Sequence, residues 1–326
     1  MSRKTLVLAP SRLGDALPRL PVFAALARSG RVVCGLFRDG QAAFEPTLLR
    51  WRKENTPAHL ALPIALPWGG QEGVKAATLA GLGFDEALIL EPGFAAGLVA
   101  LRAGIPERWG YTAGLAGLLL NRRARRPAGW QDRPLGRREV ELLGELGAPW
   151  QDETRLDVPR GWQAVGRERL DAAKITGKRK TIGIYAGKSG GDTVDGWPRT
   201  SFEELIRGLR QQRSDLQFVL VAQLEDLWQA VLLYEKTGKI HPVIGPDLPF
   251  SGLLATLTCL DLVIAADSTL LHLAAALGVP TLGLYERNAA LRRPSGDRHS
   301  IIEREPLRLL APEKVQAAAL EMLGGS

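Results

Sequence analysis

Three turns of the chain carry side chains that could bind an anion or move a proton, and each follows a short apolar run. The first is Gly-Lys-Ser-Gly-Gly at 187–191, which offers backbone N–H groups, the hydroxyl of Ser189 and the ammonium of Lys188. It does not match the P-loop of nucleotide triphosphatases, because only three residues separate Gly183 from Gly187 and no helix opens directly after the lysine. The turn is therefore either another kind of anion site or an ordinary surface turn.

The second turn joins the apolar runs 261–267 and 279–285 through a helical pattern. Asp267 and Ser268 are placed to cap this helix, Thr269 comes next, and His272 follows about one turn later. The free N–H groups and the macrodipole at a helix start attract phosphate. Each of these residues also has a plain structural explanation, capping for the first three and core packing for the histidine. A phosphate site is thus one of two open interpretations.

The third turn, Ser-Arg-Leu-Gly-Asp at 11–15, follows the apolar run 5–10 and precedes a helical pattern. Asp15 stands at the start of that helix, where an N-terminus stabilises a carboxylate as an anion. A capping role is the common explanation for an aspartate at this position. A general base facing a ligand cleft is the functional alternative.

These turns are positioned by short apolar strands that alternate with helices, a pattern typical of parallel sheets covered on both faces. Strands are expected at 5–10, 31–37, 86–91, 180–186, 217–222, 261–267 and 279–285, and helices at 16–30, 93–104, 201–212, 268–278 and 312–323. A stretch rich in proline and charge at 147–162 separates two series. We expect an α/β protein with two doubly wound, Rossmann-like domains, 1–155 and 156–326, whose last helix could pack on either domain. Ligands of such sheets bind at the carboxyl ends of the strands.

Composition narrows the classes of protein. The 326 residues carry a net charge of +7, which favours anionic ligands, but aromatic residues are not interleaved with the arginines in sequence as a single-strand binder would require. No strand-to-helix turn has the G-x-G-x-x-G fingerprint, so a nicotinamide dehydrogenase is not expected. Two cysteines and four scattered histidines give no zinc spacing. No apolar run is long enough to span a membrane, and the chain is expected to be cytoplasmic.

Four segments, in order along the chain, resemble motifs of glycosyltransferase family 9, the bacterial heptosyltransferases. They are SRLGD at 11–15, GIPERWGY at 104–111, AGKSGGDTVDGWPRTSFEELI at 186–206 and ADSTLLHLAAALGVPTLGLY at 266–285. The last is long and specific. This resemblance implies a GT-B architecture of two facing Rossmann-like domains with a cleft between them. It also implies transfer of a sugar from an ADP-heptose-like donor to an anionic cell-envelope glycan or glycolipid, as in lipopolysaccharide biosynthesis.

The resemblance also implies roles for single residues, with no cofactor besides the donor and no metal. Asp15 would be the general base, Glu225 would hold the ribose, and the leaving diphosphate would meet the second-domain turns. Inversion at the anomeric carbon would follow, and the absence of a D-x-D motif agrees with metal-independent chemistry. An acceptor of this kind would bring the protein to the inner face of the cell membrane as a peripheral protein. The implied donor residues are Lys188, Ser189, Glu225, Asp267, Ser268, Thr269 and His272, and the acceptor-side residues are Arg12, Arg108 and Arg122.

Three positions depart from the family pattern, all on the donor side. Thr269 replaces a glycine, Asp195 stands where a lysine is usual, and Glu286 replaces a glycine after the last motif. They motivate the main alternative, a non-catalytic relative that binds a glycan, a nucleotide or a protein partner. A nucleotide-sugar epimerase or hydrolase and a nucleic-acid binder are further alternatives, although no nucleic-acid partner is expected.

Overall fold

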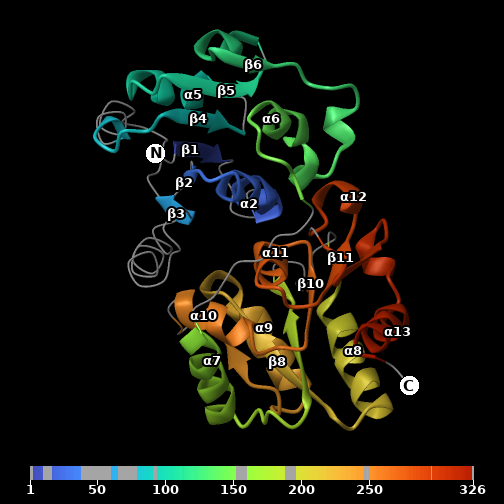
Figure 1. Cartoon of the computed structure of the whole chain (residues 1–326). Coiled ribbons are helices and arrows are strands. Elements are labelled where there is room, and N and C mark those ends of the chain that lie inside the picture. The colour runs from blue at the N-terminus through green and yellow to red at the C-terminus, as the bar shows by residue number, and fades with distance from the viewer. Residues whose placement is uncertain are drawn as a thin grey trace. The chain divides into compact units, whose positions relative to one another are not determined.

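The chain consists of two compact α/β units, Met1–Glu153 and Thr154–Ser326, each built on one parallel sheet (Figure 1). The computed structural model describes residues 3–9, 17–37, 60–64, 79–90, 94–112, 114–151, 160–187, 196–245, 248, 250–294 and 296–324. The expected α/β class with parallel sheets is confirmed. Among the described residues, no helix has the length and apolar character that crossing a membrane would require.

The sheet of the first unit has the strand order β3-β2-β1-β4-β5-β6. Val7 of the central strand points into one core cluster, and its neighbours Leu6 and Leu8 point into another, so helices cover both faces. The strands are β1 Lys4–Ala9, β2 Val32–Phe37, β3 Leu60–Ile64, β4 Glu86–Ile89, β5 Glu107–Tyr111 and β6 Arg122–Ala124. The α-helices are α2 Leu20–Arg28, α5 Phe94–Arg102 and α6 Val140–Glu145, with 3-10 turns η1 Leu17–Arg19, η3 Gly114–Leu119, η4 Trp130–Asp132 and η5 Leu135–Arg137.

The sheet of the second unit has the order β12-β11-β10-β7-β8-β9. Its strands are β7 Lys180–Tyr185, β8 Leu216–Val221, β9 Val243–Ile244, β10 Leu262–Ala266, β11 Thr281–Tyr285 and β12 His299–Glu303. Its helices are α7 Arg160–Ala172, α8 Arg199–Gln212, α9 Leu227–Lys236, α10 Phe250–Leu257, α11 Thr269–Ala276, α12 Ala289–Arg292 and α13 Pro312–Met322, with 3-10 turns η7 Leu224–Asp226 and η8 Leu307–Leu309. Three neighbouring strands, β10, β7 and β8, therefore precede the turns that carry the expected donor residues.

The C-terminal helix α13 packs within the second unit, against α8 and the strands β10 and β12. Val315 and Ala319 of this helix join the same core cluster as Trp197 and Phe202, whose rings meet edge to face at 4.6 Å. The Trp197 indole N–H donates to the carbonyl of Leu310, 2.9 Å away, and so fixes the chain just before the helix. Of the two positions considered from the sequence, the structure gives α13 a place on its own unit.

The helix expected at 16–30 begins later than its sequence pattern predicts. It opens as the 3-10 turn η1 and becomes α-helical only at Leu20, with Arg19 at the N-cap and no side-chain capping bond. Asp15 as the N-cap of the α-helix is therefore wrong, because Pro18 and Pro21 favour a separate tight first turn. Asp15 and Arg12 themselves lie outside the described residues.

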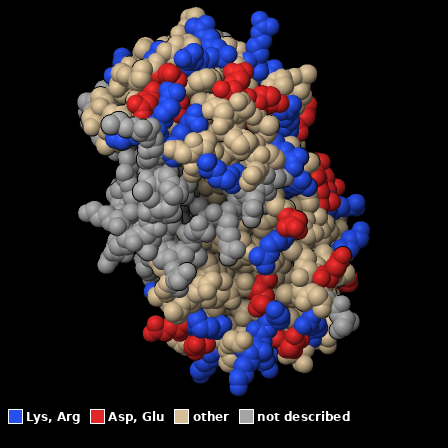
Figure 2. Space-filling view, in the orientation of Figure 1, with Lys and Arg blue, Asp and Glu red and all other residues tan. Residues whose placement is uncertain are grey.

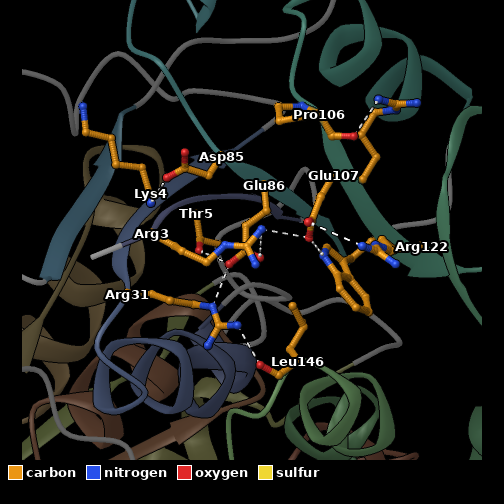
Figure 3. Close-up of polar contacts among 12 residues, drawn as sticks. Arg3, Lys4, Thr5, Arg31, Asp85, Glu86, Pro106, Glu107, Arg122 and Leu146 are labelled. Atoms are coloured by element: carbon orange, nitrogen blue, oxygen red, sulfur yellow. Dashed lines mark hydrogen bonds and ion pairs between the residues drawn. The ribbon is translucent and has the colours of Figure 1, made fainter. Parts of the chain in front are cut away.

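A buried ion-pair network closes the amino ends of the first sheet (Figure 3). Glu86 is fully buried and accepts from the Thr5 hydroxyl at 2.5 Å and from the Arg31 guanidinium at 2.6 Å. Arg3 bridges Glu86 at 3.5 Å and Glu107 at 2.8 Å. Because the network ties together β1, β4, β5 and the start of β2 at the edge opposite the strand carboxyl ends, its role is structural.

Candidate functional site

The carboxyl ends of β7, β10 and β11 bring the second-unit turns to one edge of the sheet. β10 pairs with both neighbours in parallel register, and the Asp267 N–H extends the pairing to the carbonyl of Leu284 at 3.0 Å. The chain therefore leaves β7 after Tyr185, β10 after Ala266 and β11 after Tyr285 at this same edge. This is the edge where ligands of open parallel sheets bind.

Helix α11 begins at that edge with a capped N-terminus. Ser268 has extended backbone angles, and its hydroxyl oxygen accepts from the N–H of Leu271 at 3.3 Å. Capping by Ser268 is therefore confirmed. Thr269 is the first helical residue and is partly exposed, whereas Leu270, Leu271 and His272 after it are buried. The remaining N–H groups of the first turn and the helix dipole favour an anion there.

The sequence predicted that Asp267 would help to cap the helix, but the N-cap is Ser268. Asp267 instead links the start of the helix to Arg292 of a later helix. One carboxylate oxygen lies 3.4 Å from Nε2 of His272, and the other lies 2.6 Å from Nε of Arg292. Burial alone would raise the pKa of Asp267, but the neighbouring His272 and Arg292 outweigh it and hold this pKa below its ordinary value. The carboxylate stays ionised and fixes the arginine beside the start of α11.

His272 and Tyr285 form the buried floor beneath this pair. The His272 side chain is 1% exposed; its Nε2 faces Asp267, and its Nδ1 has no hydrogen-bond partner within the described residues. The Tyr285 hydroxyl is also buried without a hydrogen-bond partner there, and burial, with the charge of Asp267, raises the pKa of this tyrosine. Buried polar groups normally have partners, so unsatisfied ones below an open edge indicate a place where a polar ligand arrives.

The glycine-rich turn after β7 is described only as far as Gly187. Gly187 has φ of +51°, and a Cβ there would lie 2.7 Å from the Tyr185 ring, so the chain needs glycine at this bend. Tyr185 in turn donates its hydroxyl to Asp226, whose other oxygen accepts from the N–H of Gln223 at 2.7 Å. Lys188, Ser189 and Asp195 lie outside the described residues.

Glu225 belongs to the 3-10 turn η7, which follows β8 directly. Its backbone therefore lies at the carboxyl end of the strand next to β7, although its side chain lies outside the described residues. The adjacent Asp226, which sequence reasoning did not select, anchors this turn to Tyr185. The signal was available, because Gln223 and Asp226 have the spacing of a reciprocal capping box.

Arg108 and Arg122 are the two acceptor-side candidates that the structure describes, and both make contacts near the amino ends of the strands of the first sheet. Arg108 donates to the carbonyls of Leu119 and Ile105, both at 2.8 Å, and so holds the chain around η3. Arg122 lies 3.5 Å from Glu107 and 5.6 Å from the centre of the Trp109 ring. Arg108 lies near the start of β5 and Arg122 starts β6. The structure therefore does not bring them to the carboxyl end of β1, which Asp15 follows in the chain.

Arginines and tryptophans of the first unit come together in space although they are not interleaved in sequence. Arg126 and Arg138 both lie over the Trp130 ring, at 4.3 and 4.8 Å from its centre, and Arg137 lies over Trp150 at 5.1 Å. These arginines therefore make cation–π contacts with tryptophans of their own unit. On the face shown in Figure 2, basic and acidic side chains are intermingled, unlike the continuous basic stripe of a nucleic-acid binder.

A buried charge pair lies at the start of α2, where sequence reasoning selected nothing. Arg19 is 6% exposed and its Nε lies 3.5 Å from a carboxylate oxygen of the fully buried Glu139. Burial raises the pKa of Glu139 to about 7, and the charges of Arg19 and Arg138 only partly oppose this. The pair ties η1, which begins two residues after Asp15, to the start of α6.

The raised pKa of Glu139 predicts a stability that falls as pH rises. The folded state holds the proton more tightly than the unfolded state, whose glutamate has the ordinary value of 4.5, so this contribution is lost from about pH 4.5 to pH 7. The loss is on the order of 3 kcal/mol. In Glu139→Gln, the free energy of unfolding in urea should vary less with pH over this interval. Glu145→Gln, on the exposed face of the same helix, should keep the wild-type slope, and equal slopes in all three proteins would contradict the assignment.

Comparison with known proteins identifies the class of fold and then the family. Each unit is a Rossmann-like α/β fold, and GT-B glycosyltransferases are built of two such units in one chain. A glycosyltransferase family 9 protein from Veillonella parvula superposes with a TM-score of 0.82 at 17% identity, covering 98% of this chain and 97% of that one. E. coli ADP-heptose lipopolysaccharide heptosyltransferase II gives 0.76 at 20% identity, with 98% of each chain covered. E. coli heptosyltransferase WaaC with ADP gives a TM-score of 0.74 at 18% sequence identity, covering 98% of this chain and 99% of that one.

The family model for glycosyltransferase family 9 (heptosyltransferase) matches residues 76–307. The chain belongs to this family, and its class of enzyme is glycosyltransferase. No curated protein sequence matches the chain. Within the described residues, no three His, Cys, Asp or Glu side chains gather as a metal-binding group.

Proposed function

We propose that this protein is an inverting, metal-independent glycosyltransferase that uses an ADP-linked, heptose-like sugar. Its acceptor would be an anionic glycan or glycolipid of the cell envelope. The observation that carries the donor side is the start of α11, where Asp267 contacts both Arg292 and the buried His272 directly before the first N–H groups of the helix. A cation and a helix N-terminus together suit a nucleoside diphosphate, which carries its negative charge on the phosphates.

The reaction follows from the charges that develop. The acceptor hydroxyl attacks C1 of the donor sugar from the side opposite the diphosphate, and the new C–O bond forms as the bond from C1 to the phosphate oxygen breaks. ADP leaves with the electron pair, and Arg292 with the α11 N-terminus stabilises its growing charge. The hydroxyl proton passes to the carboxylate of Asp15. Attack from the opposite side inverts the anomeric configuration.

The other donor residues have roles that follow from their positions. Ser268 fixes the first turn of α11, and Thr269 opens it with a hydroxyl at the helix start. Lys188 and Ser189 would meet the phosphates from the turn after β7, and Glu225 would accept from ribose hydroxyls at the end of β8. Thr269 fits a normal helix start, which favours retained donor binding despite the missing glycine.

Calorimetric titration with ADP, UDP and GDP, with EDTA and then with Mg²⁺, tests the proposal. We expect ADP to bind selectively, with the same dissociation constant under both conditions. Binding of none of the three by a folded protein would favour the non-catalytic alternative. Consumption of an ADP-sugar without any acceptor would indicate a hydrolase or an epimerase. Affinity that depends on Mg²⁺ would reject the metal-independent mechanism.

Arg292 provides a sharper test of the donor side. Arg292→Gln should weaken ADP binding about tenfold, because a hydrogen-bonded ion pair with phosphate is worth about 1.5 kcal/mol or more. Binding of adenosine, which has no phosphate, should not change. Arg293→Gln removes a neighbouring exposed charge and is the matched control. If the two variants weaken ADP binding equally, Arg292 contributes to this binding only through the net charge of the protein.

A further inference from the structure

Helix α9 of the second unit presents an apolar face to solvent. Leu224 is 76% exposed and Trp228 is 56% exposed, and Val231 and Leu232 are each about 40% exposed. Spacings of three and four residues place these side chains on one face of the helix and the turn before it, while Ala230 and Leu233 point into the core. Apolar side chains exposed singly are ordinary, but a stripe that includes a tryptophan marks a contact surface.

Helices α8 and α9 both pack against β8 (Figure 1). Residues of α8 and of the end of α9 line a cationic groove. It has a volume of about 330 Å³, and its lining includes Arg207, Arg210 and Lys236. The one carboxylate in the lining, Glu203, is already paired with Arg199 on the same helix. The groove therefore carries an excess of positive charge and suits a phosphate group.

The apolar stripe and the groove meet along α9. Leu232 and Lys236 are one helical turn apart, so the groove begins where the stripe ends. Between them, Glu235 is paired with Lys239 at 2.9 Å, which offsets the acidic charge of Glu235. A tryptophan and aliphatic side chains beside a row of cations are the composition of helices that lie in the interface of a membrane.

We propose that this face of α8 and α9 docks on an anionic phospholipid surface, with the stripe in the interfacial layer and the groove on a lipid phosphate. A second copy of the chain is the less favourable occupant. A symmetric contact through this face would bring the cations of one groove against the same cations of its partner. Four apolar side chains also give less area than a stable dimer buries. The proposal does not depend on the donor or the acceptor of the transferase.

Co-sedimentation of the full chain with vesicles tests this docking. We expect binding to vesicles of phosphatidylcholine mixed with phosphatidylglycerol, and much weaker binding to phosphatidylcholine alone. The double variant Arg207→Gln with Arg210→Gln should lower the partition coefficient about thirtyfold, since each cation near an anionic surface contributes about a factor of five. Arg308→Gln with Lys314→Gln removes two exposed charges elsewhere on the same unit and should change little. Equal losses in both pairs would mean that net charge alone attracts the protein, and would overturn the proposal.

The apolar stripe is tested separately. Trp228→Ala with Leu232→Ala should lower the partition coefficient at least tenfold and remove the shift of tryptophan fluorescence that vesicles induce. This variant should stay folded and bind ADP as the wild type does, because neither side chain belongs to the hydrophobic core. If the wild type binds neither kind of vesicle, the proposal is overturned. If it forms a dimer that this variant loses, the surface joins two copies of the chain instead.

Discussion

Asp15→Asn should lower the transfer rate by about a hundredfold to ten-thousandfold while leaving ADP binding intact. An amide cannot take the acceptor proton, and a positioned general base contributes a factor of this size. The binding of ADP should not change, because the proposed donor residues follow strands of the other unit. Single-turnover kinetics with a saturating ADP-sugar, together with calorimetry of ADP, separates the two effects.

The control for Asp15→Asn is Asp132→Asn, an exposed aspartate of the same unit. It should transfer at the wild-type rate. If Asp15→Asn also keeps the wild-type rate, another group removes the proton and Asp15 serves only the backbone of its turn. If the variant loses ADP binding as well, its effect reaches beyond proton transfer and the assigned role is wrong.

Gly166→Ala should destabilise the second unit by about 3 kcal/mol. Gly166 lies where α7 crosses α10, and a Cβ there would meet the carbonyl oxygen of Ala255 at 2.1 Å and its carbon at 2.5 Å. Backbone atoms cannot turn away as a flexible side chain would, so the two helices must separate and lose their packing. Unfolding in urea followed by circular dichroism measures the change.

Gly161→Ala, on the exposed side of the same helix, is the matched control. A Cβ at this position meets nothing within 4 Å, so the alanine should stabilise the helix by up to about 1 kcal/mol. Opposite signs for the two variants would show that close helix contact, and not helix propensity, decides the effect at Gly166. Equal stabilisation by both would contradict the contact between α7 and α10.

The sequence alone predicts the alternating α/β pattern and the turns that carry the proposed donor residues. Apolar runs such as 261–267 and 279–285 became β10 and β11 within two residues of the expected ends, and Ser268 caps α11 as expected. These features are local, because strand burial, helix period and capping depend on residues a few positions apart. The family resemblance rests on the same local motifs, and the family match confirms it.

Edge strands and several helices were not predicted. β6 is Arg-Arg-Ala, which has no apolar pattern, and β9 is only Val-Ile, which is too short to show one. Each forms because a neighbouring strand offers its backbone. Their formation depends on the sheet already built beside them.

Only the tertiary structure decided which distant side chains act together. The sequence predicted Asp267 as a helix cap, but in the folded protein its carboxylate pairs with Arg292 of a later helix. Folding likewise joins Arg19 to Glu139, and it packs Gly166 onto the backbone at Ala255. No local pattern encodes these pairs, because packing between elements far apart in the chain brings them together. The sequence by itself thus determined the fold class and the positions of the proposed donor turns, and the tertiary structure determined which side chains contact the residues of those turns.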